Sequence, residues 1–459
     1  MARISTDRNG PTPPIAVAVA AAIGIVGAAG CWMSGQLSPE GSVTFGTFLM
    51  TGLLWVSGAI PPYVAGVAGA AILSAAIPTG LLAADSAPSV PWMEVVRQAV
   101  SPAVVMTLAG MMLALAAART GMDRVIAERL LGPTLHRPAA LLASVLASGA
   151  LLSMFMSNTA TAVLLLAIVV PIVAPMGRES PAARAVVLAA ALGAAVGGLA
   201  TPIGTSPNVI AYGLIREAGL QVGFLQWAAV GLPVAVAVLL CGALVLRSLA
   251  DGFRAWTPPA RARRLPRPGL AGWTWCAVFL ATVVLWSTQP WTAIPIERAS
   301  LLPIVALPAL GLVRAPELRA IDWRTLLLLF AGLVLGAAMG RTGVAAWLVG
   351  WSVPATAPDA VVVASFCAVS VVLSTFMSNT ATANLLVPMA LALGDPALAL
   401  PCALASALGS SLAVGLPVST PPMLLAHATG FVRPRELAML GVVIGLLGTL
   451  AVTASIRLR

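Results

Sequence analysis

The chain carries one polar octapeptide twice. Phe-Met-Ser-Asn-Thr-Ala-Thr-Ala occupies residues 155–162 and recurs letter for letter at residues 376–383, each time inside a long apolar stretch. Ser, Asn and Thr favour the start of a helix, where backbone N–H groups lack partners within the helix. Those groups and the positive end of the helix dipole attract anions. Ser157-Asn158-Thr159 and Ser378-Asn379-Thr380 are therefore candidate anion-binding tips; the alternative is that they only close tight turns.

Two more serines stand at matched positions, because Ser153 and Ser374 each lie four residues before a tip serine. Residues four apart share a helix face, so each serine adds a hydroxyl beneath its tip. We interpret this pair as cation ligands. The alternative is that each hydroxyl bonds to the backbone of its own helix.

A second pair of polar segments follows downstream, again within apolar sequence. Proline removes a helical hydrogen bond and frees carbonyls, which membrane proteins tolerate where the carbonyls line a cavity or bind something. Hydroxyl, amide and carbonyl oxygens suit Na⁺, so we predict cation sites at these breaks; the alternative is a simple kink. The residues are Thr201, Pro202, Gly204, Thr205 and Pro207 in the first break, and Pro417, Ser419, Thr420, Pro421 and Pro422 in the second.

No Asp, Glu or Arg occurs in any of the four polar segments. A doubly charged anion held there would lose its hydration without meeting a formal counter-charge. Bound cations would supply that charge, and cation and anion would then bind cooperatively. A proton relay built on carboxylates is disfavoured.

Composition places these segments in a membrane. Of the 459 residues, 59% are hydrophobic and 9% charged, whereas soluble domains carry about a quarter charged residues. This excludes intrinsic disorder, a secreted disulfide scaffold and a nucleic-acid-binding domain. The net charge of +10 comes from arginines alone, which we assign to the positive-inside rule. No nucleophile–base pair, metal cluster or carboxylate dyad occurs in the spans, so we predict neither an enzyme nor a bound cofactor, with Na⁺ as coupling ion.

The predicted fold is an all-α polytopic membrane protein with about eleven membrane helices and two re-entrant hairpins. The hairpins are the interrupted stretches at about 138–176 and 359–392. The other spans are roughly 13–34, 43–60, 62–82, 101–119, 183–215, 223–247, 272–290, 299–313, 325–342, 397–428 and 437–456.

Matching segments divide the chain into inverted repeats, a plan that is typical of secondary transporters. Arg-Thr-Gly at 119–121 recurs at 341–343 upstream of the octapeptides, and an odd number of crossings separates the copies. Arginine placement puts the N-terminus in the cytoplasm of a cell (inner) membrane protein. The predicted domains are scaffold helices (1–100), repeat 1 (101–249, with its broken helix at 183–215), a cytoplasmic linker (250–271), further scaffold helices (272–324) and repeat 2 (325–459, with its broken helix at 397–428).

With these motifs, most of the chain from about residue 40 resembles the divalent anion/sodium symporter family. The resemblance implies sodium/dicarboxylate cotransport, a homodimer and elevator-like motion of a transport domain. It implies sodium ligands at Ser153, Asn158 and the backbone near Gly204, and at Ser374, Asn379 and the backbone near Ser419. Substrate would lie between the two tips, beside Pro207, Thr420 and Pro421.

The second break departs from the family pattern, since Met423 stands where the first break has Asn208 and relatives often have Asn. His427 follows one turn later. It would either bond a neighbouring carbonyl or, if protonated, replace a sodium ion. We therefore expect sodium-coupled symport of C4-dicarboxylates such as succinate, malate and fumarate. The alternatives are a sodium-independent dicarboxylate exchanger, or transport of sulfate or tricarboxylates on the same scaffold.

Overall fold

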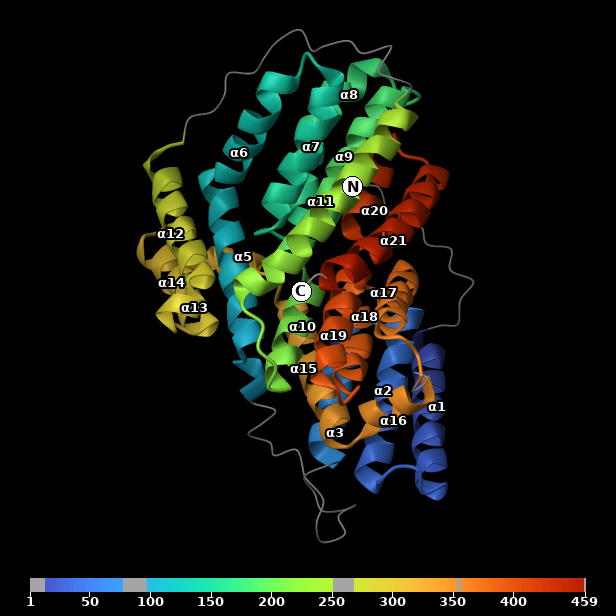
Figure 1. Cartoon of the computed structure of the whole chain (residues 1–459). Coiled ribbons are helices and arrows are strands. Elements are labelled where there is room, and N and C mark those ends of the chain that lie inside the picture. Colours follow the sequence, from blue (N-terminus) through green and yellow to red (C-terminus); the bar gives the residue numbers. More distant parts are fainter. Residues whose placement is uncertain (1–12, 77–96, 251–267, 353–355, 458–459) are drawn as a thin grey trace.

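The computed structural model of the protein describes residues 13–76, 97–250, 268–352 and 356–457, and every regular element within those ranges is helical (Figure 1). Nine helices of the described chain are long and apolar enough to cross a membrane, and three shorter apolar helices accompany them. This confirms the prediction of an all-helical, multi-pass membrane protein. Most of the predicted linker at 250–271, and residues 1–12 and 77–96 of the predicted N-terminal scaffold, lie outside the described residues.

One order of seven helices occurs twice. The first series comprises α5 (Pro102–Thr120), α6 (Met122–Leu131), α7 (Pro138–Ser153), α8 (Asn158–Val173), α9 (Pro181–Gly197), α10 (Ser206–Glu217) and α11 (Phe224–Leu249). The second comprises α15 (Trp323–Arg341), α16 (Val344–Ser352), α17 (Asp359–Phe376), α18 (Asn379–Leu391), α19 (Pro396–Ser410), α20 (Pro421–Ala428) and α21 (Pro434–Arg457). The two octapeptides fall at the α7–α8 and α17–α18 junctions, which we name hairpin 1 and hairpin 2.

The repeated Arg-Thr-Gly motif has a conformational cause. Gly121 follows α5 with φ of 70°, and Gly343 follows α15 with φ of 74°. Glycine adopts this left-handed conformation without the steric cost of a Cβ, so it ends one helix and lets another begin at once. The short helices α6 and α16 that follow lie outside the spans predicted from the sequence.

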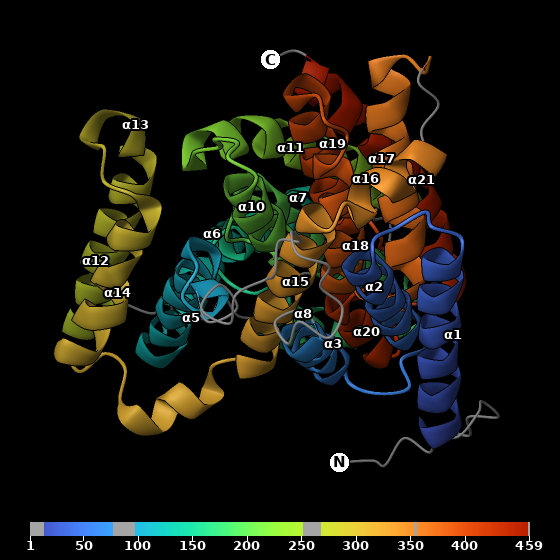
Figure 2. The ribbon, with the colours of Figure 1, turned by 90° about the horizontal axis from the view of Figure 1, so that it is seen from below.

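The two broken helices run in opposite directions. In Figure 1, α9 lies above α10, whereas α19 lies below α20. Between the two series stand α12 (Leu270–Ser287), α13 (Gln289–Thr292) and α14 (Ile296–Ala309), and α1 (Pro13–Met33), α2 (Pro39–Ser57) and α3 (Pro62–Ala76) precede the first. Figure 2 shows α12 and α14 on one edge of the molecule and α1 and α2 on the opposite edge. Helix α14 packs on α5 as α3 packs on α15.

Helix α9 forms the centre of the first series, since 94% of its most apolar stretch is buried. Its small residues allow backbones to approach closely, as is usual between membrane helices. A Cβ on Gly149 of α7 would lie 2.9 Å from the backbone of Gly193 in α9. This close packing fixes hairpin 1 against the break that follows α9.

Candidate functional site

Both hairpin tips are helix N-termini capped by their own serines. The Oγ of Ser157 accepts a hydrogen bond from Ala160 N at 3.2 Å, and the Oγ of Ser378 accepts one from Ala381 N at 3.2 Å. The remaining first-turn N–H groups of α8 and α18 have no partner within their own helices. Each tip therefore presents donors and a positive dipole end, as an anion site requires.

A first oxygen cluster lies beneath the tip of hairpin 1. The Oγ of Ser153, fully buried, is 2.8 Å from Asn158 Oδ1 and 2.6 Å from the carbonyl oxygen of Ala194 in α9. A serine hydroxyl has one hydrogen, so it cannot donate fully to both acceptors. The Nδ2 of Asn158 donates to Ala195 O at 3.3 Å, which directs the amide oxygen toward the serine.

The second repeat contains the same cluster. The buried Oγ of Ser374 is 2.7 Å from Asn379 Oδ1 and 2.6 Å from the carbonyl oxygen of Ser410 at the end of α19. Again three oxygens share one hydroxyl hydrogen. Two independent copies of this crowding indicate places where a cation would be favourable.

Gly204 approaches the first cluster through its backbone. A Cβ built on Gly198 would lie 2.7 Å from Gly204 O and 3.0 Å from Asn158 Oδ1, so both oxygens face the same spot. The structure thus brings together Ser153, Asn158 and Gly204. In the second break, the Ser419 hydroxyl donates to Leu416 O at 2.7 Å within its own loop, and the predicted backbone ligand near Ser419 stays a prediction.

The predicted substrate residues differ in exposure between the repeats. Ser157 and Thr159 of hairpin 1 are exposed, whereas Ser378, Asn379 and Thr380 of hairpin 2 are half-buried. In the breaks, Pro207 and Thr420 are buried and Pro421 is exposed.

Asn208 closes the first break, a role the sequence did not reveal. Its buried Nδ2 lies 3.0 Å from Gly198 O, 3.4 Å from Leu199 O and 2.8 Å from Thr201 O. Met423, at the matching position, is fully buried and apolar, and its loop is held by the Ser419 hydroxyl instead. The two breaks are therefore held by different hydrogen bonds.

Replacing Asn208 by Met should open the first break, because a buried carbonyl left without a donor costs about 1–3 kcal/mol. We expect a lower midpoint of thermal unfolding in detergent and weaker transport. Met423→Leu is the matched control, since a volume-conserving apolar change costs less than about 1.5 kcal/mol. Equal unfolding midpoints for the two variants would contradict the role given to Asn208.

His427 contacts the loop that follows its own helix. Its Nδ1 is 2.9 Å from Val432 O, in the loop between α20 and α21. At 1.5 Å of rise per residue, it stands roughly 10 Å along α20 from Thr420. This contact is the bond to a neighbouring carbonyl that was one of the two roles expected for His427.

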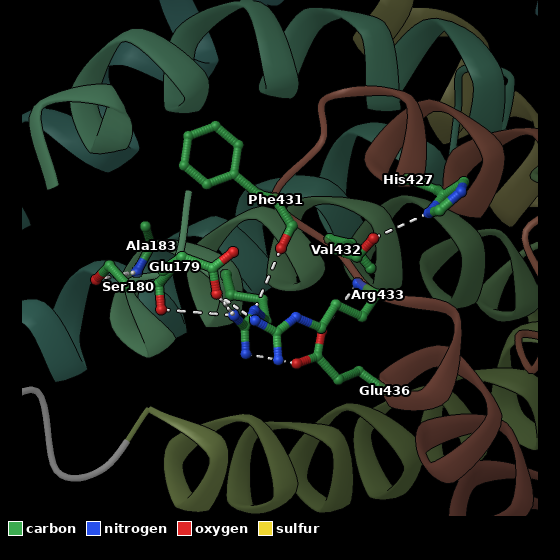
Figure 3. A network of polar contacts seen from close by, with 9 residues as sticks. Glu179, Ser180, Ala183, His427, Phe431, Val432, Arg433 and Glu436 are labelled. Atoms are coloured by element: carbon green, nitrogen blue, oxygen red, sulfur yellow. Dashed lines mark hydrogen bonds and ion pairs between the residues drawn. The ribbon is translucent and has the colours of Figure 1, made fainter. Parts of the chain in front are cut away.

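An ion-pair network joins the repeats beside that loop (Figure 3). Arg184 Nη1 binds Glu436 Oε1 at 2.6 Å, with both side chains 12% exposed, and Arg433 pairs with Glu179. Arg184 Nε also donates to Phe431 O at 3.2 Å. These bonds tie the start of α9 to the start of α21.

The second halves of the broken helices are exchanged between the repeats. Helix α10 packs on α18 and α19, and α20 packs on α8 and α9. Both tips and both breaks consequently belong to one packed unit. Within the described residues, no group of three His, Cys, Asp or Glu could hold a metal ion.

Some site residues gave no signal in the sequence. The carbonyls of Ala194 and Ser410 could not be foreseen, because every residue carries such a group. Asn384 did differ from its counterpart Val163, the first mismatch after the octapeptides. It is fully buried with both amide atoms unpartnered, and a Cβ on Gly332 would overlap its carboxamide.

Comparison with solved structures supports the fold. The chain is similar to the Alcanivorax borkumensis YdaH transporter, with a TM-score of 0.55 and 17% identity, covering 89% of this chain and 98% of that one.

Several curated relatives are transporters. The chain is 28% identical over 333 residues to the inorganic phosphate transporter PHO87 of Saccharomyces cerevisiae, covering 68% of this chain and 35% of that protein. It is 26% identical over 397 residues to the sodium-dependent dicarboxylate transporter SdcS of Staphylococcus saprophyticus, covering 78% of this chain and 76% of that protein. The chain thus spans about a third of the yeast relative.

The citrate transporter family model (CitMHS) matches residues 52–288 and 282–458. The expected resemblance to divalent anion/sodium symporters is thereby supported in its coarser form, as membership of a related group of anion transporters rather than enzymes. On these matches, the chain belongs to the citrate transporter family.

Proposed function

We propose that this transporter couples the entry of Na⁺ to the uptake of C4-dicarboxylates such as succinate, malate and fumarate. The carrying observation is the pair of oxygen clusters at Ser153–Asn158 and Ser374–Asn379, each with three oxygens around one hydroxyl hydrogen. A sodium ion at each cluster would relieve the repulsion between the unprotonated oxygens. Two clusters support a requirement for at least two sodium ions.

The substrate would lie between the two tips. Because Ser157 and Ser378 accept hydrogen bonds from backbone amides, each hydroxyl keeps its own hydrogen to donate to a carboxylate. Pro207, Thr420 and Pro421 would border the anion. The sodium ions would provide the positive charge that these neutral donors lack, so each ligand would strengthen binding of the other.

Alternating access would follow an elevator-type motion within a homodimer. The moving unit would contain both hairpins and both broken helices, and the exchanged packing of α10 and α20 supports their movement together. Helices α1–α3 and α12–α14 would form the scaffold. Arginine placement favours a cytoplasmic N-terminus in the cell inner membrane.

The relatives differ in what their names describe, since SdcS is a sodium-dependent dicarboxylate transporter and PHO87 an inorganic phosphate transporter. Phosphate, sulfate and citrate therefore belong in any substrate test. A sodium-independent exchanger, the alternative, would rely on a charged His427, whose Nδ1 lies 2.9 Å from Val432 O.

Uptake into proteoliposomes tests the proposal. With radiolabelled succinate outside, an inward Na⁺ gradient should drive accumulation with a steeper than linear dependence on Na⁺. Replacing Na⁺ by choline should abolish uptake, and unlabelled phosphate, sulfate or citrate should compete poorly. Succinate counterflow at full rate without Na⁺ would indicate an exchanger instead, and uptake of phosphate alone would reassign the substrate.

A further inference from the structure

A cavity of about 240 Å³ lies beside the tip of hairpin 1. Its walls come from α5 and α6, from hairpin 1 and from α12, and they include Leu113, Met156 and Phe279. Phe155 of the tip meets Phe279 edge-on, with ring centroids 4.9 Å apart. The cavity thus lies between hairpin 1 and α5, next to the contact between Phe155 and Phe279.

The lining selects for an apolar occupant. Asp123 is the charged residue among the lining side chains, and its Oδ1 already accepts from Arg124 N at 2.6 Å. The indole N–H of Trp275 is likewise used, since it donates to Leu113 O at 2.9 Å. Apolar cavities without free polar partners stay dry, and one of about 150 Å³ already admits benzene.

The mouth of the cavity opens beside exposed apolar side chains. Leu151 and Leu280 line it and are 46% and 60% exposed, and Leu280 belongs to the candidate membrane span of α12. An exposed leucine within a membrane span contacts lipid rather than water. Bilayer lipids are therefore the molecules that we expect to reach the cavity.

The other repeat fills the corresponding space with protein. Leu335, Met339 and Met377 match Leu113, Ala117 and Met156, and all three are buried in one apolar cluster. Phe45 and Phe48 of α2 pack against that cluster. The first repeat has smaller Ala117 and a gap at this place, so the fold itself does not demand a void there. An empty apolar void forfeits packing contacts on its walls.

We propose that the end of an acyl chain from a bilayer lipid occupies this cavity, between the tip of hairpin 1 and α5. The acyl chain would fill the space that corresponds to the one filled by Met339 and the aromatic side chains of α2 in the second repeat. The site is independent of the anion and cation sites, because none of their residues line it.

Photolabelling tests this site. The full-length protein is placed in phosphatidylethanolamine–phosphatidylglycerol vesicles that contain a phospholipid with a diazirine near the end of one acyl chain. After irradiation, mass spectrometry should find label on Leu113 and Met156, which are only 1% and 7% exposed, as well as on exposed Leu280.

Two variants fill the cavity from opposite walls, Ala114→Leu from α5 and Cys276→Phe from α12. Each should lose label at Leu113 and Met156 while keeping it at Leu280, which reports correct insertion. Ala237→Leu, on the exposed side of α11, a helix that does not line the cavity, should label like the wild type. Label confined to Leu280 and other exposed positions in the wild type, or label at Leu113 that survives both filling variants, would overturn the proposal. Neither result depends on transport, so a failed uptake assay does not bear on this site.

Discussion

Alanine at Asn158 or Asn379 should abolish sodium-dependent succinate uptake at the Na⁺ concentrations that suffice for the wild type. Each substitution removes an amide oxygen that lies within 2.8 Å of a buried serine hydroxyl. Interactions with charged partners contribute about 1.5–3 kcal/mol, so the Na⁺ concentration for half-maximal uptake should rise about 10- to 100-fold. The measurement is a sodium titration of uptake in proteoliposomes, with sodium protection against thermal unfolding as a readout of binding.

The matched control is Thr375→Val, next to Ser374 on the same helix. The Thr375 hydroxyl donates to Val371 O at 2.8 Å within its own helix, so its loss should leave the sodium dependence unchanged. Uptake at wild-type rates and sodium concentrations by both asparagine variants would remove the proposed cation sites.

The second large effect is expected from Gly198→Ala. The new methyl group would enter the space that Gly204 O and Asn158 Oδ1 share, at 2.7 and 3.0 Å. Since both contacts are with atoms held by the backbone or by other hydrogen bonds, the break must shift, and overpacking typically costs about 1–3 kcal/mol. Sodium should no longer stabilise the first site, and uptake should be lost although the protein still inserts.

Gly110→Ala provides the comparison, because its nearest neighbour would be Ile203 at an ordinary 3.8 Å. It should transport normally. If Gly198→Ala binds Na⁺ and transports as the wild type does, the backbone near Gly204 is not a cation ligand.

The sequence predicted the elements that carry polar residues far better than the contacts between them. The octapeptides lie at helix starts, since Ser157 and Ser378 are typical N-caps, and the proline-rich segments fall where α9 and α19 end and α10 and α20 begin. Helices α6 and α16 were not predicted, because they are too short to span a membrane and follow directly after a glycine turn. Element type is a local property, which explains this success.

Contacts depend on the whole fold and were harder to foresee. The carbonyl of Ala194 accepts a hydrogen bond from Ser153, 41 residues away in sequence. The identity of an alanine does not predict such a backbone contact. Asn208 was visible as a family feature, but its three carbonyl partners follow from the path of the break. His427 invited an electrostatic role, whereas its actual partner is a nearby carbonyl.

The exchange of α10 and α20 between the repeats has a consequence for biosynthesis. Helix α8 completes its packing against α20, which ends at Ala428, so the ribosome must translate the chain to that residue before hairpin 1 meets this partner. Domains usually fold from the N-terminus as they emerge. The first repeat therefore enters the membrane before its contact with α20 can form. A truncation that removes α20 should disrupt the packing of hairpin 1 as well as that of the second repeat.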